Sequence, residues 1–172
     1  PETARMLKQL VLMGGVFTNR QPGVGPTEWN AIGDPHATAI VYRAPVRKHI
    51  SIGLDVTTRC RLNADLMREK FQGGLLDIVR DLAEVWFRST SVMTFHDPLA
   101  AVSIFDPDVC QYRRGRVSVE LASSRLMGCT YFDTEEILVG PADKPAEPDA
   151  PHYVALDVDS ERFFTQYFSV FS

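Results

Sequence analysis

Three short segments of the sequence hold residues of the types from which binding and acid–base sites are built. The first reads LVLMGG and ends at Gly15, the second reads TEWN and ends at Asn30, and the third reads TFHDPLAA around His96. They offer a thioether, carboxylates, an indole, an amide and an imidazole, which are common lining and proton-transfer groups. The candidate site residues are Met13, Glu28, Trp29, Asn30, His96 and Asp97.

Each segment also has an ordinary structural explanation when it is taken alone. A glycine pair after a strand usually makes a tight turn, and an acid or amide in a loop often caps a turn. A single histidine such as His96 is more often a hydrogen-bonded structural residue than a catalyst. Asp34 lies directly before Pro35, which is typical of a helix start.

The elements around these segments predict an α/β fold. Leu10–Met13 is a continuous apolar run, as expected of a strand buried in a parallel sheet. Ile50, Ile52 and Leu54 alternate, which predicts a second strand ending at Asp55. A helix opens at Asp34-Pro35, and we expect Ala37, Ile40 and Val41 to form its inner face. Ligands of such folds bind beyond the carboxyl ends of the parallel strands, where Gly14-Gly15 and Asp55 would lie.

The second half of the chain predicts more helices and then antiparallel strands. One helix runs from Asn63 to Lys70, and a longer amphipathic helix follows Gly73-Gly74. Its apolar stripe consists of Leu75, Ile78, Val79, Leu82, Val85 and Trp86. An apolar, buried helix follows Asp97-Pro98. Strands are expected near Val117, Thr130 and Tyr153–Val158, a mobile proline-rich loop over 140–151, and a final helix capped by Asp159 with an aromatic face.

Composition excludes several classes of function. The chain has 172 residues and a net charge of −4, so it lacks the basic field of a nucleic-acid or anionic-membrane binder. No apolar run reaches the roughly 18 residues of a membrane span. The first ten residues do not resemble a signal peptide. Cys60, Cys110 and Cys129 are widely spaced, without a CxxC pair, so we expect reduced thiols in a cytoplasmic protein.

The segments together, in this order and with LDVTTR between them, resemble the inosine/uridine-preferring nucleoside hydrolase family. The resemblance also covers GRVSVEL, ALDVDSERFF and the terminal helix, and so extends over nearly the whole chain. It implies an α/β fold with a parallel sheet, flanking helices and a small antiparallel section. It further implies hydrolysis of the N-glycosidic bond of ribonucleosides to ribose and free base, with Ca²⁺ as cofactor and a homo-oligomeric assembly.

The resemblance also implies roles for individual residues. Glu28 and Asn30 match ribose-binding positions, Trp29 matches an aromatic wall of the sugar site, and Met13 matches a methionine beneath the sugar. His96 matches a histidine that in some members faces the nucleobase, where it protonates or polarises the leaving group; a packing or orienting role is the alternative. Asp97 matches a calcium ligand.

The family's opening aspartate cluster, DxDxxxDD in outline, is absent from this sequence. That cluster supplies the catalytic base and most metal carboxylates, so residues 1–172 are expected to be the C-terminal portion of one nucleoside hydrolase-like domain. A separate N-terminal segment is the implied partner. Without it the chain would bind metal weakly and hydrolyse little. A non-catalytic nucleoside- or sugar-binding remnant is the second hypothesis, and a generic α/β domain with coincidental motifs is the third.

Overall fold

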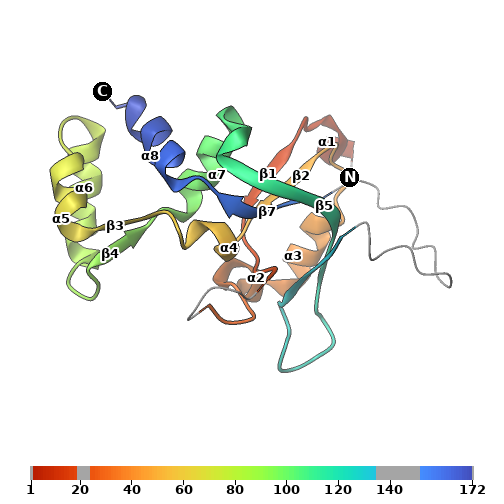
Figure 1. Ribbon diagram of the computed structural model, residues 1–172. Helices are drawn as coiled ribbons and strands as arrows, with labels where there is room; N and C mark the ends of the chain where they lie inside the picture. Colours follow the sequence, from red (N-terminus) through yellow and green to blue (C-terminus); the bar gives the residue numbers. More distant parts are fainter. Residues whose placement is uncertain (1, 19–23, 135–151, 172) are drawn as a thin grey trace.

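The computed structural model describes residues 2–18, 24–134 and 152–171, and its centre is a mixed five-stranded sheet in the order β1-β2-β7-β5-β6 (Figure 1). The strands are β1 (Leu10–Met13), β2 (His49–Ile52), β5 (Cys110–Val119), β6 (Thr130–Thr134) and β7 (His152–Val158). Strands β1, β2 and β7 are parallel, whereas β5 is antiparallel to both β7 and β6. The expected loop over 140–151 lies outside the described residues.

The register of the parallel strands aligns the carboxyl ends of β1 and β2, while β7 continues beyond them to Val158. Met13 of β1 is paired with Ile52 of β2, and Ser51 of β2 is paired with Val154 of β7. Among the described residues, β1 pairs on one side only, with β2. The glycines after β1 and the turn after β2 therefore lie at the same edge of the sheet.

Helices surround the sheet, and side chains of the predicted types cap several of them. The helices of this part are α1 (Glu2–Met6), α2 (Trp29–Gly33), α3 (Pro35–Tyr42), α4 (Leu54–Thr57), α7 (His96–Phe105) and α8 (Ser160–Ser169), with a 3₁₀ turn, η1 (Pro107–Val109). Asp34 caps α3 by accepting from Ala37 N at 2.8 Å, and Asp159 caps α8 by accepting from Arg162 N at 2.9 Å. Both caps satisfy backbone amides that a helix start leaves free.

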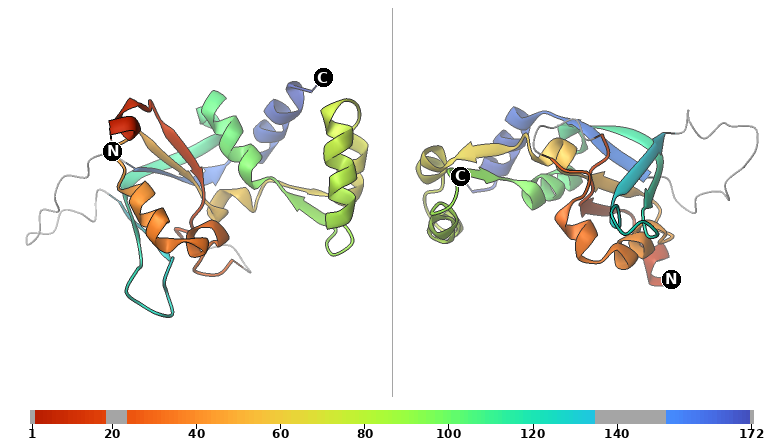
Figure 2. Two further views of the ribbon diagram at one scale, coloured as in Figure 1. Left: turned by 180° about the vertical axis from the view of Figure 1, so that it is seen from behind. Right: turned by 90° about the horizontal axis from the view of Figure 1, so that it is seen from below.

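An arm extends away from the five-stranded sheet, as Figure 1 and both views of Figure 2 show. It consists of β3 (Arg61–Asn63), α5 (Ala64–Lys70), α6 (Leu75–Trp86) and β4 (Val92–Thr94). Strands β3 and β4 form a two-stranded antiparallel sheet of their own. The sequence analysis predicted both helices but missed this pair, because three-residue strands leave no readable alternation.

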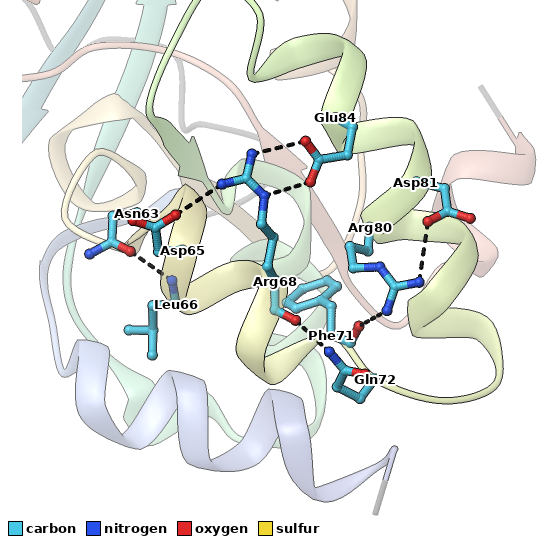
Figure 3. A network of polar contacts seen from close by, with 9 residues as sticks. All are labelled: Asn63, Asp65, Leu66, Arg68, Phe71, Gln72, Arg80, Asp81 and Glu84. Carbon is cyan, nitrogen blue, oxygen red and sulfur yellow. Dashed lines mark hydrogen bonds and ion pairs between the residues drawn. The ribbon is translucent and has the colours of Figure 1, made fainter.

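An ion pair and a hydrogen bond connect α6 of the arm to α5 and the residue that follows it (Figure 3). Arg68 of α5 donates to both carboxylate oxygens of Glu84 of α6, at 2.6 and 2.9 Å. Arg80 of α6 donates to the carbonyl of Phe71 at 3.1 Å and to Asp77 at 2.8 Å. The bidentate geometry fixes the orientation of the guanidinium of Arg68, so the arm is a defined hairpin of helices.

The main core lies where the arm, α7 and α8 meet. Phe71, Phe95 and Phe163 are buried there, and the ring of Phe95 lies 5.4 Å from that of Tyr167 and 5.2 Å from that of Phe164. The aromatic face predicted for the last helix is thereby confirmed as a packing surface. A second, smaller cluster on the α3 side of the sheet contains Tyr42, Val117 and Val154.

Three local predictions differ from the structure. Ile40 of α3 is 69% exposed, and Ala39 and Tyr42 form the buried face instead. The segment PHATAIVY is apolar all round, so its periodicity does not define one buried side. Leu54 begins α4 and does not continue β2. The end of α7 is solvent-exposed, with Phe105 at 87%. The prediction was wrong for the end of α7 and for the inner face of α3, because an apolar composition was taken as a sign of burial.

The apolar stripe of α6 lies on its solvent side. Its six residues are between 37% and 70% exposed, while Leu76 and Ala83 are the buried residues of that helix. The hydrophobic pattern therefore predicted the amphipathic helix correctly, but no described residues cover its apolar stripe.

The predicted α/β class, with its parallel strands, flanking helices and antiparallel strands, is confirmed. The late antiparallel strands belong to the main sheet. No helix in the described ranges is long and apolar enough to cross a bilayer. Cys60, Cys110 and Cys129 are buried free thiols, as the spacing predicted.

Candidate functional site

The candidate site is built around the backbone that leaves β1. Gly14 N donates to Ile52 O at 3.3 Å, and Leu54 N donates to Gly15 O at 2.9 Å, so the ends of β1 and β2 are joined. Gly15 has a φ of +88°, a conformation that favours glycine. A Cβ at Gly53 would lie only 2.7 Å from Gly15 O. The close approach of these two segments forms the floor of the site.

Glu28 fixes this floor from the loop before α2. Its side chain is 4% exposed and caps α2, accepting from Asn30 N at 2.7 Å and from Ala31 N at 3.2 Å. The same carboxylate accepts from Gly15 N at 3.3 Å. The capping explanation for this acid is therefore correct as far as it goes, and the cap also ties α2 to the end of β1.

Asn30 and Met13 lie together beside Glu28. The side-chain amide of Asn30 donates to Met13 O at 3.3 Å and lies 3.5 Å from Met13 Sδ. These residues line one side of a cavity of about 220 Å³, which continues along α3 past Asp34 to Tyr42. Three candidates from two of the three segments are thus brought to one concave surface.

Trp29 does not line this cavity. Its side chain is 81% exposed on the first turn of α2, although its neighbours on both sides contact the floor. An indole exposed to this degree has an apolar surface free to contact a ligand or another polypeptide segment.

His96 and Asp97 form the first turn of α7 and also lie outside the lining of that cavity. His96 is half-buried, and its Nδ1 lies 2.8 Å from the hydroxyl of Thr57. Burial lowers the pKa of His96 below its ordinary value, while the negative charges of Asp97 and Glu28 oppose this shift. Asp97 is solvent-exposed.

Two buried side chains that sequence reasoning did not select hold the backbone after Gly15. Asp55 of α4 accepts from Phe17 N and Thr18 N, both at 2.8 Å. Thr130 of β6 donates to Val16 O and accepts from Val16 N, both at 2.9 Å. The available signal for Asp55 was its place directly after a strand, at the sheet edge where ligands bind.

The carboxylates present do not make a complete calcium site. Ca²⁺ takes about six to eight oxygen ligands, several of them from carboxylates. Within residues 2–18, 24–134 and 152–171, no group of three or more His, Cys, Asp or Glu side chains is placed to hold a metal ion. The donor set of the described residues therefore does not fit the ion without further groups.

Comparison with known protein families identifies the family to which the chain belongs. The model of the family described as "Inosine-uridine preferring nucleoside hydrolase" matches residues 1–165. The chain belongs to this family. The resemblance carried by the LVLMGG, TEWN and TFHDPLAA segments is thus confirmed at the level of the whole chain.

Individual relatives cover this chain well but are much longer than it is. "Uridine nucleosidase 1" of Arabidopsis thaliana is 27% identical over 126 residues, which are 68% of this chain and 37% of that protein. The solved "Purine-Preferring Ribonucleoside Hydrolase from Gardnerella vaginalis" is 25% identical with a TM-score of 0.72, covering 94% of this chain and 51% of that one.

A solved plant nucleoside hydrolase has the same fold, with a TM-score of 0.76 at 22% identity. It covers 94% of this chain, while this chain covers 52% of it. The chain therefore spans about half the length of these solved relatives.

Proposed function

We propose that this chain is the C-terminal portion of a ribonucleoside N-glycosidase, which cleaves nucleosides with water into ribose and free base. The observation that carries the proposal is the meeting of Met13, Glu28 and Asn30 at one cavity, beyond the carboxyl end of a parallel strand. This is where α/β folds bind ligands, and the chain belongs to a family named for nucleoside hydrolysis.

The proposal assigns each candidate residue the role that the family resemblance implies. Glu28 and Asn30 bind ribose hydroxyls, Met13 supports the sugar from below, and Trp29 covers its face. Water adds to the anomeric carbon as the bond to the base nitrogen breaks. His96 donates a proton or a hydrogen bond to the departing base, which is otherwise a poor leaving group.

The proposal requires groups from a further polypeptide segment. The base that accepts the proton of the attacking water, and the carboxylates that would complete a Ca²⁺ site with Asp97, are expected from an N-terminal segment with the aspartate cluster. The edge of β1 supports such a partner, because its half-buried apolar residues pair only with β2 among the described strands. We also propose a homo-oligomeric assembly and, since the three cysteines are free thiols, a cytoplasmic location.

Complementation tests this function directly. The chain is mixed or co-expressed with an aspartate-rich N-terminal segment of a nucleoside hydrolase, and ribose release from inosine and uridine is measured with and without Ca²⁺. Activity should require both polypeptides, and Glu28→Ala should abolish it. Absence of ribose release from a folded, co-purifying assembly contradicts the proposal.

A non-catalytic nucleoside- or sugar-binding protein is the second candidate. It is favoured by the donor set, because the described residues offer no cluster that could hold a metal. Isothermal titration calorimetry of the chain with ribose and inosine, each with and without Ca²⁺, separates the two functions. Tight binding without Ca²⁺, combined with no hydrolysis after complementation, supports the binding protein.

A further inference from the structure

Thr57 lies in the single turn α4 and contacts His96 of α7. Its side chain is fully buried, and its Oγ1 lies 2.8 Å from Nδ1 of the imidazole. No residue of this turn belongs to the candidate set that the family resemblance supplied. The contact links the histidine to a part of the chain that precedes it by 39 positions.

The direction of this hydrogen bond follows from where the hydroxyl proton can go. If Nδ1 carried the ring proton and donated it, the buried hydroxyl of Thr57 would need a second acceptor for its own hydrogen. The neighbouring Thr58 has such an acceptor, Leu54 O at 2.7 Å. For Thr57, the ring nitrogen is the hydrogen-bond partner that the described chain provides. A buried hydroxyl without an acceptor is destabilising, so the hydroxyl donates.

We propose that Thr57 is a positioning residue that holds His96 in one tautomer, with Nδ1 accepting from the hydroxyl and Nε2 carrying the ring proton. Nε2–H is then the hydrogen-bond donor that the ring can present to a ligand. This inference rests on the proposed function for its meaning, since the departing base is the group that needs a donor. The tautomer itself can be measured without any activity.

The turn that carries Thr57 is the same turn that holds the floor of the site. Leu54 N donates to Gly15 O at 2.9 Å, and Asp55 accepts from the backbone of Phe17 and Thr18. A movement of α4 would therefore shift the floor and the imidazole together. The four residues Leu54–Thr57 therefore support both the backbone after β1 and the imidazole of His96.

Long-range ¹H–¹⁵N correlation spectra of the full chain, labelled with ¹⁵N and recorded near pH 8 where a free imidazole is neutral, report which ring nitrogen carries the proton. The signals of His96 are assigned by their loss in His96→Gln. The wild-type chain should show a protonated Nε2 and an unprotonated Nδ1. In Thr57→Val, which keeps the shape and removes the donor, both nitrogens should shift toward the average of two exchanging tautomers.

Two matched variants control the experiment. Thr57→Ser restores a hydroxyl and should restore the wild-type pattern, whereas Thr58→Val removes the adjacent hydroxyl and should leave His96 unchanged. Signals of the buried His49 and His152 report whether each variant is folded. Should Thr57→Val not fold, the wild-type pattern and Thr57→Ser still decide. A protonated Nδ1 in the wild type, or an unchanged His96 pattern in folded Thr57→Val, overturns the inference.

Discussion

At the scale of single residues, Glu28 is the group on which the backbone of the site most depends. We expect Glu28→Ala to lower the free energy of unfolding by about 2–3 kcal/mol, because it removes a helix cap and leaves the buried Gly15 N–H without an acceptor. Urea denaturation followed by circular dichroism measures the change. Asp34→Ala, which removes an exposed cap on α3, should cost only about 1 kcal/mol. Equal losses in the two variants would contradict a role for Glu28 beyond capping.

His152 gives the stability of the chain a predictable pH dependence. Its Nε2 lies 2.9 Å from Tyr42 O and its Nδ1 accepts from Val117 N at 2.7 Å, an arrangement that requires the neutral ring. Burial lowers the pKa of His152 from 6.5 to about 4. The hydrogen bond to Tyr42 opposes this shift, and the nearby His49 and Arg116 add to it. The unfolded chain therefore binds this proton more readily than the folded chain.

The sign of the effect follows from this difference. The contribution of His152 is fully present above pH 6.5 and is lost as the pH falls from 6.5 toward 4. The loss amounts to about 3 kcal/mol at most, and burial of His49 acts in the same direction. Denaturation at a series of pH values measures it. His152→Gln should reduce the loss of stability between pH 6.5 and 4, whereas His36→Gln, at an exposed position of α3, should not. A stability of the wild-type chain that does not change over this range would contradict the prediction.

The residues of the site were predictable to different degrees for physical reasons. Met13, Glu28 and Asn30 were selected from the LVLMGG and TEWN segments through the family resemblance, and the structure brings them to one cavity. Thr57 was missed, because a hydroxyl that bonds to a distant side chain has no local sequence pattern. Asp55 was placed at the ligand-binding edge of the sheet, but its bonds to the backbone of Phe17 and Thr18 could not be read from the sequence. Their partners are 37 to 39 positions away.

At the scale of elements, the close packing of α4 against the end of β1 can be tested at Gly53. A Cβ at this position would meet Gly15 O at 2.7 Å and the ring of Phe17 at 3.0 Å. Since the carbonyl belongs to the backbone and cannot rotate away, Gly53→Ala should destabilise the chain by about 1–3 kcal/mol. Thermal denaturation measures the change in Tm.

A glycine in open space provides the comparison. A Cβ at Gly33, at the end of α2, meets no atom within 4 Å, so Gly33→Ala should leave Tm unchanged or raise it slightly. Equal Tm values for the two alanine variants would show that α4 can shift at little energetic cost. Such a result would also argue against α4 as a fixed support of His96.

Element prediction succeeded where burial and periodicity agree. The strand Leu10–Met13 was identified from its continuous apolar run, and the last helix from its helical spacing, which puts Phe163, Phe164 and Tyr167 on one side. It failed for α3, where apolar residues lie all round the helix and only tertiary contacts select the buried side. Sequence periodicity defines an element more reliably than it defines what covers that element.

At the scale of the whole molecule, the described residues leave two apolar surfaces uncovered, which are the edge of β1 and the stripe of α6. The chain spans about half the length of the solved relatives it matches. A sheet edge and an apolar helix face of this size favour association with other polypeptide. The chain alone is therefore expected to show concentration-dependent self-association in sedimentation velocity.

Two substitutions on α6 distinguish the role of its exposed apolar stripe from that of its buried face. Leu82 is 69% exposed and Leu76 is 3% exposed, although they lie six positions apart on one helix. Leu82→Glu should reduce self-association and leave the free energy of unfolding within about 0.5 kcal/mol, because the new charge remains in water. Leu76→Glu should cost several kcal/mol, because it places an unpaired carboxylate in the core. If Leu82→Glu were as damaging as Leu76→Glu, the stripe would belong to the core of this chain; if it changed neither association nor stability, the open surface responsible for association would be the edge of β1.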